Sequence, residues 1–357
     1  MAPAQTEVKK YFPALLAASS EVRTMACARA WAVTVLSLLP PAARAYAMHG
    51  ARVVESRAVC ANGRSRLIRV APTVGTAAWA DEYAPGHVLA LELRDAGGVP
   101  RRGPYTVSRA GAATLDVIYR VIDPAQLPPT GAAAAHAAAC AAERKSALLA
   151  ATSAGDALAL GGRFHTPIWE GIELRGCAAV FLVSSGVGVG PQLGFAELCA
   201  ASWRSAPSAA HAAPPVRLFA GFREAGDVAC AAELDELADA SDVDPRSGLA
   251  RFAWVACLSA DGEAARPRAW RAETRTGRTS AAAPPLIGAT ARALGAPLSA
   301  CHFHVIGRGG LVAEWRQALE AVGVAAGRVS SEVYFAHDEA ADPTAVERIA
   351  RALKNAN

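Results

Sequence analysis

Aromatic and charged residues are scarce in this chain of 357 residues. Aromatic residues make up 6% of the sequence and charged residues 19%, and the formal net charge is only +4. The basic residues are scattered, whereas a nucleic-acid-binding surface gathers lysine and arginine on one face. We therefore expect no nucleic-acid partner. Hydrophobic residues reach 52%, a content that is typical of a globular protein and argues against a disordered one.

The cysteines lack any metal-binding or disulfide pattern. The eight cysteines are spread from Cys27 to Cys301, and no two of them have the CxxC spacing. Zinc sites, iron–sulfur clusters and disulfide-stabilised small domains need closely spaced cysteines. The sequence therefore predicts no metal site, and its thiols are typical of buried side chains in a reducing compartment.

Acidic residues are rare in residues 1–50, where only Glu7 and Glu21 occur. The apolar run 30–39 ends at two prolines and is shorter than the roughly 20 residues of a membrane-spanning helix. We expect no spanning segment, and peripheral membrane association stays open. Because an acid-poor start is typical of an organelle transit segment, we interpret residues 1–50 as a leader, with the mitochondrion preferred, or as a partner-docking extension. Another organelle, the cytoplasm or a plain alanine-rich extension are the alternatives.

Short alternating segments follow, separated by turn residues. Spacing of this kind is typical of a small antiparallel barrel, which we predict over residues 51–175. An alanine-rich stretch at 123–143 predicts a loop that runs into a helix. The predicted strands are 66–70, 88–94, 104–108, 115–121 and 157–162.

From residue 176 to 340 the pattern changes to alternating strands and helices, which predicts a doubly wound parallel sheet. The polar stretch 261–283 has no period and predicts a long loop, and a final helix at 343–354 is expected within a C-terminal segment 341–357. The predicted strands are 178–184, 216–221, 252–258 and 302–307, and the predicted helices are 192–203, 228–240, 285–295 and 311–322.

The segment 180–191 is an apolar strand that breaks into a glycine turn and then enters a helix. Glycine lets a backbone approach a phosphate closely, and the N–H groups of a first helical turn bind anions. Gly186, Gly188 and Pro191 therefore indicate an anion site. Glycine turns after buried strands are common in α/β domains, so the neighbouring motifs decide whether this turn indicates a phosphate site.

Those motifs are similar, in type and order, to the motifs of the ferredoxin–NADP reductase-type flavoprotein superfamily, which includes the cytochrome b5 reductases. The resemblance covers about residues 51–336, and it implies a two-domain protein: an antiparallel β-barrel flavin domain followed by an α/β doubly wound parallel-sheet nucleotide domain. The matching stretches are 83–87 (YAPGH), 102–108 (RGPYTVS), 185–191 (SGVGVGP), 218–223 (LFAGFR) and 332–335 (EVYF).

The resemblance implies binding of FAD and of NAD(P)H, with electrons passing from the nicotinamide through the flavin to a separate acceptor. Tyr105 and Thr106 would lie at the flavin, Ser146 at its pyrophosphate and Arg223 at the adenosine end of the nucleotide. We assign no catalytic residue. The implied cofactor-binding residues are Arg102, Tyr105, Thr106, Ser108, Ser146, Gly186, Gly188, Pro191 and Arg223.

Four departures from the superfamily pattern fall on the predicted site. Gly103 stands where the flavin arginine is expected, so either a one-residue bulge brings Arg102 into that place or the charge-assisted bond to the flavin phosphate is lost. Glu143 replaces the glycine of a GxxS turn. Val187 replaces the threonine of the nucleotide loop, and Ile306 replaces a cysteine beside the nicotinamide.

Two hypotheses for the function therefore stay open. The first is a NAD(P)H-dependent flavoprotein oxidoreductase. The second is a catalytically inactive, reductase-like accessory or structural subunit of a larger mitochondrial complex, whose partners are the other protein subunits. Arg266, Arg268 and Arg271 stand where NADP-dependent relatives hold basic residues, but the choice between NAD and NADP is left open.

Overall fold

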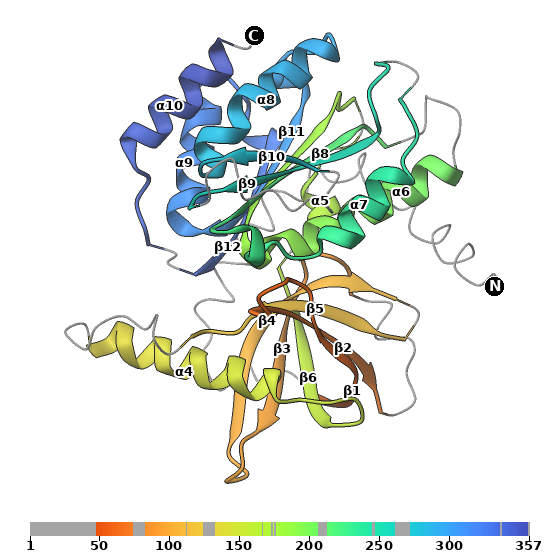
Figure 1. Ribbon diagram of the computed structural model, residues 1–357, viewed down its shortest axis with the longest axis vertical. Helices are drawn as coiled ribbons and strands as arrows, with labels where there is room; N and C mark the ends of the chain where they lie inside the picture. The colour runs from red at the N-terminus through yellow and green to blue at the C-terminus, as the bar shows by residue number, and fades with distance from the viewer. Residues whose placement is uncertain are drawn as a thin grey trace, which may run out of the picture.

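The computed structural model describes residues 48–73, 83–111, 113–123, 133–165, 167–172, 174, 176–205, 213–244, 247–260, 272–335 and 338–355. These residues form a barrel and a helix-covered sheet that pack end to end (Figure 1). The predicted leader lies outside them up to residue 47, and Arg266, Arg268 and Arg271 lie outside them as well. No helix of the described residues is long and apolar enough to cross a membrane.

Six antiparallel strands close the barrel in the order β1-β2-β5-β4-β3-β6. The predicted antiparallel barrel is therefore confirmed, although β1 begins at Met48, before the expected start at residue 51, and was not predicted as a strand. The strands are β1 (Met48–Ala58), β2 (Ser65–Pro72), β3 (Val88–Arg94), β4 (Pro100–Ala110), β5 (Leu115–Arg120) and β6 (Ala157–Phe164).

A single long helix, α4 (Ala133–Ala150), connects β5 to β6 and crosses the barrel beside β3 and β4 (Figure 1). Leu149, near its C-terminal end, is fully buried in the barrel core with Leu89, Val107 and Leu160. The alanine-rich stretch therefore covers the barrel and continues the helix past residue 143, where the prediction ended.

The second unit is a six-stranded parallel sheet with the strand order β10-β9-β8-β7-β11-β12. The chain moves outward from β7 to β10 and then returns to the other side of β7, which confirms the predicted doubly wound topology. The strands are β7 (Val180–Ser185), β8 (Val216–Phe222), β9 (Phe252–Leu258), β10 (Glu273–Thr276), β11 (His302–Arg308) and β12 (Val329–Phe335).

Helices cover both faces of this sheet because its central strands are apolar on both sides. Leu182 and Leu218 pack against α6 (Val189–Ser205) and α7 (Ala231–Asp239), while Phe181 and Phe303 stack on the other face. That second face is covered by α8 (Thr279–Ala293), α9 (Gly309–Ala321) and α10 (Pro343–Lys354), which coincides with the predicted final helix.

The predicted long loop at 261–283 is wrong over its described part. Residues 273–276 form the edge strand β10, and α8 begins at Thr279 although its prediction began at 285. Proline favours the first helical position, but Pro284 and Pro285 are not at the start of this helix. They lie in the second turn of α8. Because a proline has no N–H, each leaves the carbonyl four residues earlier without its helical hydrogen bond, and these carbonyls are close to the N-terminus of the helix.

Helix α6 crosses the barrel strand β4 so closely that only glycine fits at the crossing. A Cβ atom on Gly190 would lie 2.5 Å from the Ser108 hydroxyl oxygen, and one on Gly194 would overlap the Ser108 carbonyl oxygen. The Ser108 hydroxyl accepts a hydrogen bond from the N–H of Ile118, 3.2 Å away, and so also links β4 to β5. The glycines of α6 thus fix the contact between the two units.

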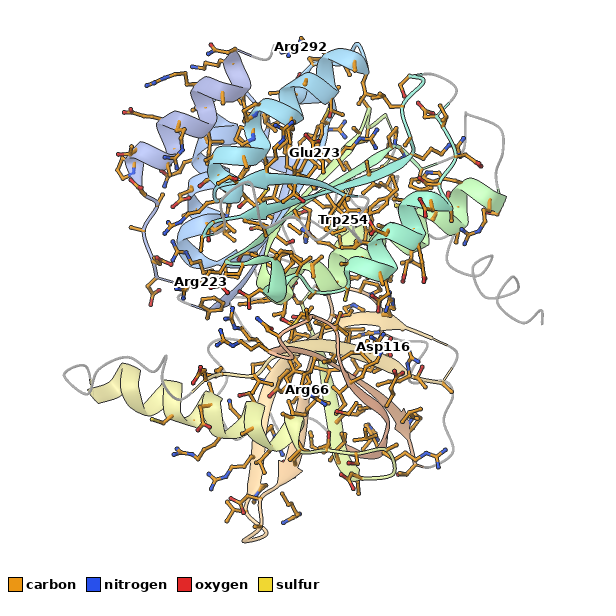
Figure 2. The ribbon with its side chains drawn as sticks, viewed as in Figure 1. Arg66, Asp116, Arg223, Trp254, Glu273 and Arg292 are labelled. Atoms are coloured by element: carbon orange, nitrogen blue, oxygen red, sulfur yellow. The ribbon has the colours of Figure 1, made fainter. Side chains whose placement is uncertain are left out.

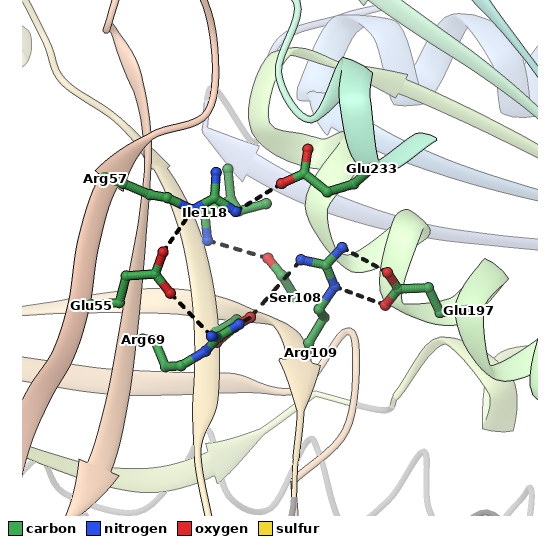
Figure 3. Close-up of polar contacts among 9 residues, drawn as sticks. Glu55, Arg57, Arg69, Ser108, Arg109, Ile118, Glu197 and Glu233 are labelled. Carbon is green, nitrogen blue, oxygen red and sulfur yellow. Dashed lines mark hydrogen bonds and ion pairs between the residues drawn. The ribbon is translucent and has the colours of Figure 1, made fainter. Parts of the chain in front are cut away.

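Ion pairs surround this contact (Figure 3). Arg109 on β4 makes two hydrogen bonds of 2.8 and 2.7 Å with the carboxylate of Glu197 on α6. Arg57 on β1 donates to Glu233 on α7 at 2.8 Å. Paired, half-buried charges of this kind orient the two units, and they contribute less to the free energy of unfolding than apolar burial does.

Two buried histidines share one hydroxyl group. His302 Nε2 and His304 Nδ1 lie 2.9 and 2.6 Å from the Ser330 hydroxyl oxygen. Burial lowers the pKa of His302 to about 4 and that of His304 to about 3, so both are neutral near pH 7. Among the described residues no group of histidine, cysteine or acidic side chains could hold a metal ion, and the histidines have a structural role.

Gly194→Ala should destabilise the protein by about 1–3 kcal/mol or more, because the new methyl group would overlap the Ser108 carbonyl. The measurement is the midpoint of urea unfolding. Gly327→Ala is the matched control, since a Cβ there meets nothing within 4 Å, and it should leave the midpoint unchanged or slightly higher. Equal midpoints for the two variants would contradict the proposed close contact.

The buried histidines predict acid sensitivity. Their folded-state pKa values are depressed below the unfolded value of 6.5, so their contribution to stability is present above pH 6.5 and is lost as the pH falls toward 4. Each should cost about 2 kcal/mol between pH 7.5 and 5. In His302→Gln the loss of unfolding free energy over that interval should shrink by this amount. An unchanged pH dependence would show that His302 is not buried in the neutral form.

Candidate functional site

The register of β4 separates Arg102 from the predicted flavin site. β3 and β4 pair without interruption from Val88↔Thr106 to Arg94↔Pro100, so no bulge brings Arg102 into the place of Gly103. Arg102 instead donates from Nε and Nη2 to Glu92, at 2.9 and 2.6 Å. Because side chains alternate along a strand, Gly103 and Tyr105 share the opposite face of β4.

Lys145 of α4 occupies the space that Gly103 leaves. A Cβ atom on Gly103 would lie 3.3 Å from Lys145 Nζ and 3.3 Å from the Tyr105 ring. Lys145 is half-buried, and none of the described carboxylates forms an ion pair with it. Burial raises the pKa of the Tyr105 hydroxyl. Lys145 and the Tyr105 ring therefore both border the position where the sequence lacks its arginine.

Thr106 faces the other way, toward the edge strand of the sheet. Its hydroxyl donates a 2.6 Å hydrogen bond to Glu332 Oε1 on β12, which joins the barrel to the nucleotide-type domain. Burial raises the pKa of Glu332 to about 7. The hydroxyl of Tyr334 is buried beside this pair, and burial and the Glu332 charge raise its pKa. The junction thus holds a carboxyl group that can gain or lose a proton near neutral pH.

Ser146 does not stand in a turn. Glu143, Lys145 and Ser146 lie within the continuous helix α4, whose backbone N–H groups are engaged in the helix. The Ser146 hydroxyl donates to the Glu143 carbonyl at 2.8 Å and accepts from the N–H of Ile122 at 3.0 Å. The backbone N–H groups at the predicted GxxS turn are therefore not free to bind an anion. The Ser146 hydroxyl instead links α4 to the residues that follow β5.

The predicted nucleotide loop is wound into a helix. Residues Gly186–Gly188 form a 3₁₀ turn that continues directly into α6, so Pro191 lies inside the first turn of that helix, which begins three residues before the predicted 192. Gly186 has φ +56° and open space around its Cβ position, so a phosphate has access to it. A Cβ on Gly188 would lie 2.8 Å from Ile306 Cγ2. Ile306 therefore covers Gly188, where a nicotinamide ring would need room.

Ser108 and Arg223 complete the predicted set. Ser108 is buried under α6 at the contact between the units and is not available to a cofactor. Arg223 follows β8 at the end of the sheet domain that faces the barrel (Figure 2). It is exposed and lies 3.6 Å from the Glu224 carboxylate, so it could reach a ligand in solution.

The described cysteines form no disulfide, and four of them, Cys199, Cys230, Cys257 and Cys301, are buried. Burial raises the pKa of Cys301, whose thiol donates to the Pro297 carbonyl at 3.7 Å. A buried, protonated thiol of this kind is not a reactive one. It offers no substitute for the cysteine that Ile306 replaces.

The residues present fit a flavin better than they fit a nicotinamide. Tyr105, the cation of Lys145 and the Thr106–Glu332 pair could hold an aromatic, phosphate-bearing group at the barrel. The nicotinamide position at Gly188 is filled by Ile306. Lys145 and Glu332 are not among the cofactor-binding residues that the resemblance implies, because only the packing of α4 and β12 beside β4 brings them there.

Known protein structures with a similar fold were found, although no similar sequence was. No family model matches the sequence, and no curated protein matches it significantly. A flavohemoglobin from Malassezia yamatoensis, solved with FAD and heme, is 15% identical with a TM-score of 0.55, over 81% of this chain and 60% of that one. The chain thus spans about 60% of the length of that protein.

Two further structures match along nearly their whole length. The FAD/NAD-binding domain of nitric oxide dioxygenase from Vibrio cholerae is 15% identical with a TM-score of 0.54, over 80% of this chain and 98% of that one. A ferredoxin–NADP+ reductase from Neisseria gonorrhoeae, solved with FAD and NADP, is 15% identical with a TM-score of 0.53, over 81% and 99%. The chain therefore has the two-domain fold of the ferredoxin–NADP reductase-type superfamily, as its motifs predict.

Proposed function

We propose that the protein is an FAD-dependent oxidoreductase that takes electrons from NADH or NADPH and passes them to a separate acceptor. The observation that carries the proposal is the Thr106–Glu332 pair at the junction of the two domains. Packing alone does not explain a buried carboxyl group, because burying it costs free energy unless the group is fully paired. Buried carboxyl groups with a raised pKa often occur at functional sites. The structural neighbours with FAD and NADP support the choice of cofactors.

The side chains at the junction have separable roles. When bound, the flavin supplies the hydride and electron chemistry, and the protein supplies position and electrostatics. Tyr105 offers an aromatic face and Lys145 a positive charge. Glu332, with a pKa of about 7, can hold a proton at its carboxyl group, while its Oε1 accepts a hydrogen bond from the Thr106 hydroxyl, 2.6 Å away.

A second candidate function is supported by Ile306. Its side chain covers Gly188, so the nicotinamide position is closed in this arrangement. We propose as the alternative that the chain is an inactive, reductase-like subunit of a larger assembly. The acid-poor residues 1–50 support a mitochondrial location for either function. A fluorescent fusion of the full chain, compared with one that lacks residues 1–50, would test that location.

The first test is for a reducible flavin. The purified full chain should show flavin absorbance, and NADH or NADPH should bleach it without oxygen. Glu332→Gln should keep the flavin and lower the rate of electron transfer to an artificial acceptor about 100-fold, because the carboxyl can no longer hold a proton. In the wild type the part of the rate that needs protonated Glu332 should fall as the pH rises through 7.

Glu320→Gln is the matched control, since Glu320 is exposed on α9 and should leave both rate and pH profile unchanged. A colourless protein that binds no flavin would exclude the oxidoreductase. A Glu332→Gln variant with the wild-type rate and pH profile would show that the Glu332 carboxyl takes no part in the reaction.

The second test opens the nicotinamide position. Ile306→Cys should relieve the contact with Gly188 and raise the rate of flavin reduction by NADH or NADPH about tenfold at subsaturating nucleotide, at a cost of about 1–3 kcal/mol in stability. Ile287→Cys, at a buried position of α8, makes the same substitution in another part of the core and should change stability alone. No gain of rate in Ile306→Cys, together with co-purification of the wild type in a large complex, would favour the accessory subunit.

A further inference from the structure

Helix α9 begins at the part of the sheet where doubly wound proteins bind their ligands. Strands β7 and β11 lie side by side, and the helices that follow them, α6 and α9, cover opposite faces of the sheet. Ligands bind outside the carboxyl ends of two strands whose helices diverge in this way. Ile306 on β11 pairs with Ser184 on β7. Two residues further along each strand, Arg308 and Gly186 therefore lie at the same level, and Gly186 faces open space.

A carboxylate of the chain itself, that of Glu339, occupies the N-terminus of α9. The N–H of Gly310 donates to Glu339 Oε2 at 3.2 Å, and Arg308 Nη1 lies 3.7 Å from Glu339 Oε1. The helix has no other anion there, because its N-cap residue makes no side-chain capping bond and its first turn has no acidic residue. Glu339 therefore takes the place that an anion takes at a helix N-terminus.

Gly310 makes room for this carboxylate. A Cβ atom on Gly310 would lie 2.8 Å from Glu339 Cδ and 3.0 Å from Glu339 Oε2. Gly310 is not among the glycines with positive φ, so its backbone conformation would admit another residue. The close approach of Glu339 is therefore the reason that the structure gives for a glycine in the first turn of α9.

Glu339 belongs to a segment that can move without unfolding its neighbours. Residues 338–342 lead into α10 and lie beyond the stretch 51–336 that resembles the superfamily. Helix α10 is held beside α8 and α9 by buried Ile349 and Leu353 (Figure 1). The Glu339 side chain, by contrast, is 37% exposed, and exposed ion pairs are weak. An anion with more charge than a carboxylate can therefore displace Glu339 while α10 stays in place.

We propose that Glu339 is an autoinhibitory group that competes with the phosphates of the nucleotide for the N-terminus of α9. The inference rests on the proposed function for the identity of the ligand, and it adds a regulation of that site. While the carboxylate is docked, its charge repels a phosphate and is paired with Arg308. When Glu339 moves away, the Gly310 N–H and Arg308 become available to the ligand. A carboxylate that is docked about nine tenths of the time weakens the apparent affinity about tenfold.

The experiment compares the purified full chain with its Glu339→Gln variant at low ionic strength. Calorimetry measures the affinity for inorganic pyrophosphate, and turnover with an artificial acceptor measures KM and kcat for NADH and NADPH. Glu339→Gln should bind pyrophosphate about tenfold more tightly and lower KM by a similar factor at unchanged kcat. Adding Gly310→Ala should cancel this gain, because the new Cβ would stand where the carboxylate lies and where the phosphate replaces it.

Asp338→Asn is the matched control. It removes the neighbouring exposed carboxylate, which forms no ion pair with the described residues, and it should change neither the pyrophosphate affinity nor KM. Thermal unfolding of each variant checks that it is folded.

An unchanged pyrophosphate affinity in Glu339→Gln would show that Glu339 only caps α9, and it would overturn the inference while a reducible flavin upholds the proposed function. An equal gain in Asp338→Asn, or a gain that survives Gly310→Ala, would also overturn it, because the anion would then bind elsewhere. A tenfold gain in Glu339→Gln in a protein without a reducible flavin would support the autoinhibitory role of Glu339 and exclude the oxidoreductase.

Discussion

The rest of the structure depends on the contact between helix α6 and barrel strand β4. Gly190 and Gly194 bring the helix backbone onto Ser108, at a separation that no side chain other than hydrogen permits. Because interiors pack as densely as crystals, such a contact admits little sliding. Arg109 and Glu197 then fix the orientation, since a two-pronged ion pair has a preferred geometry. The barrel and the sheet therefore behave as one body with a defined junction.

That junction sets the chemistry available to the protein. With α6 fixed on β4, the strand β12 lies within hydrogen-bond reach of Thr106, and Glu332 is buried there. On the other side of the sheet edge, Ile306 is pressed onto Gly188. Glu332 thus gives the junction a titratable group, whereas Ile306 covers Gly188 with an apolar side chain.

The sequence predicts the fold well and the site only in part. Periodicity and turn residues locate nine of the twelve strands in the described residues, because alternation is a local property of the chain. The predicted anion site at Gly186, Gly188 and Pro191 stays a prediction: Gly186 faces open space, whereas Gly188 lies against Ile306. Lys145 could not be predicted, since its place over Gly103 depends on how a helix distant in the sequence lies across the barrel. Edge strand β10 was missed because four residues carry too little pattern.

The glycines of α6 say less about function than the charged residues Lys145 and Glu332 do. Gly190 and Gly194 are required by the crossing of α6 and β4, so their presence says nothing about a bound nucleotide. Lys145 and Glu332 are different: Lys145 pairs with none of the described carboxylates, and a half-buried ammonium and a buried carboxyl each cost free energy in a folded protein. The proposed flavin function therefore rests on Lys145 and Glu332 more than on the glycines of the loop.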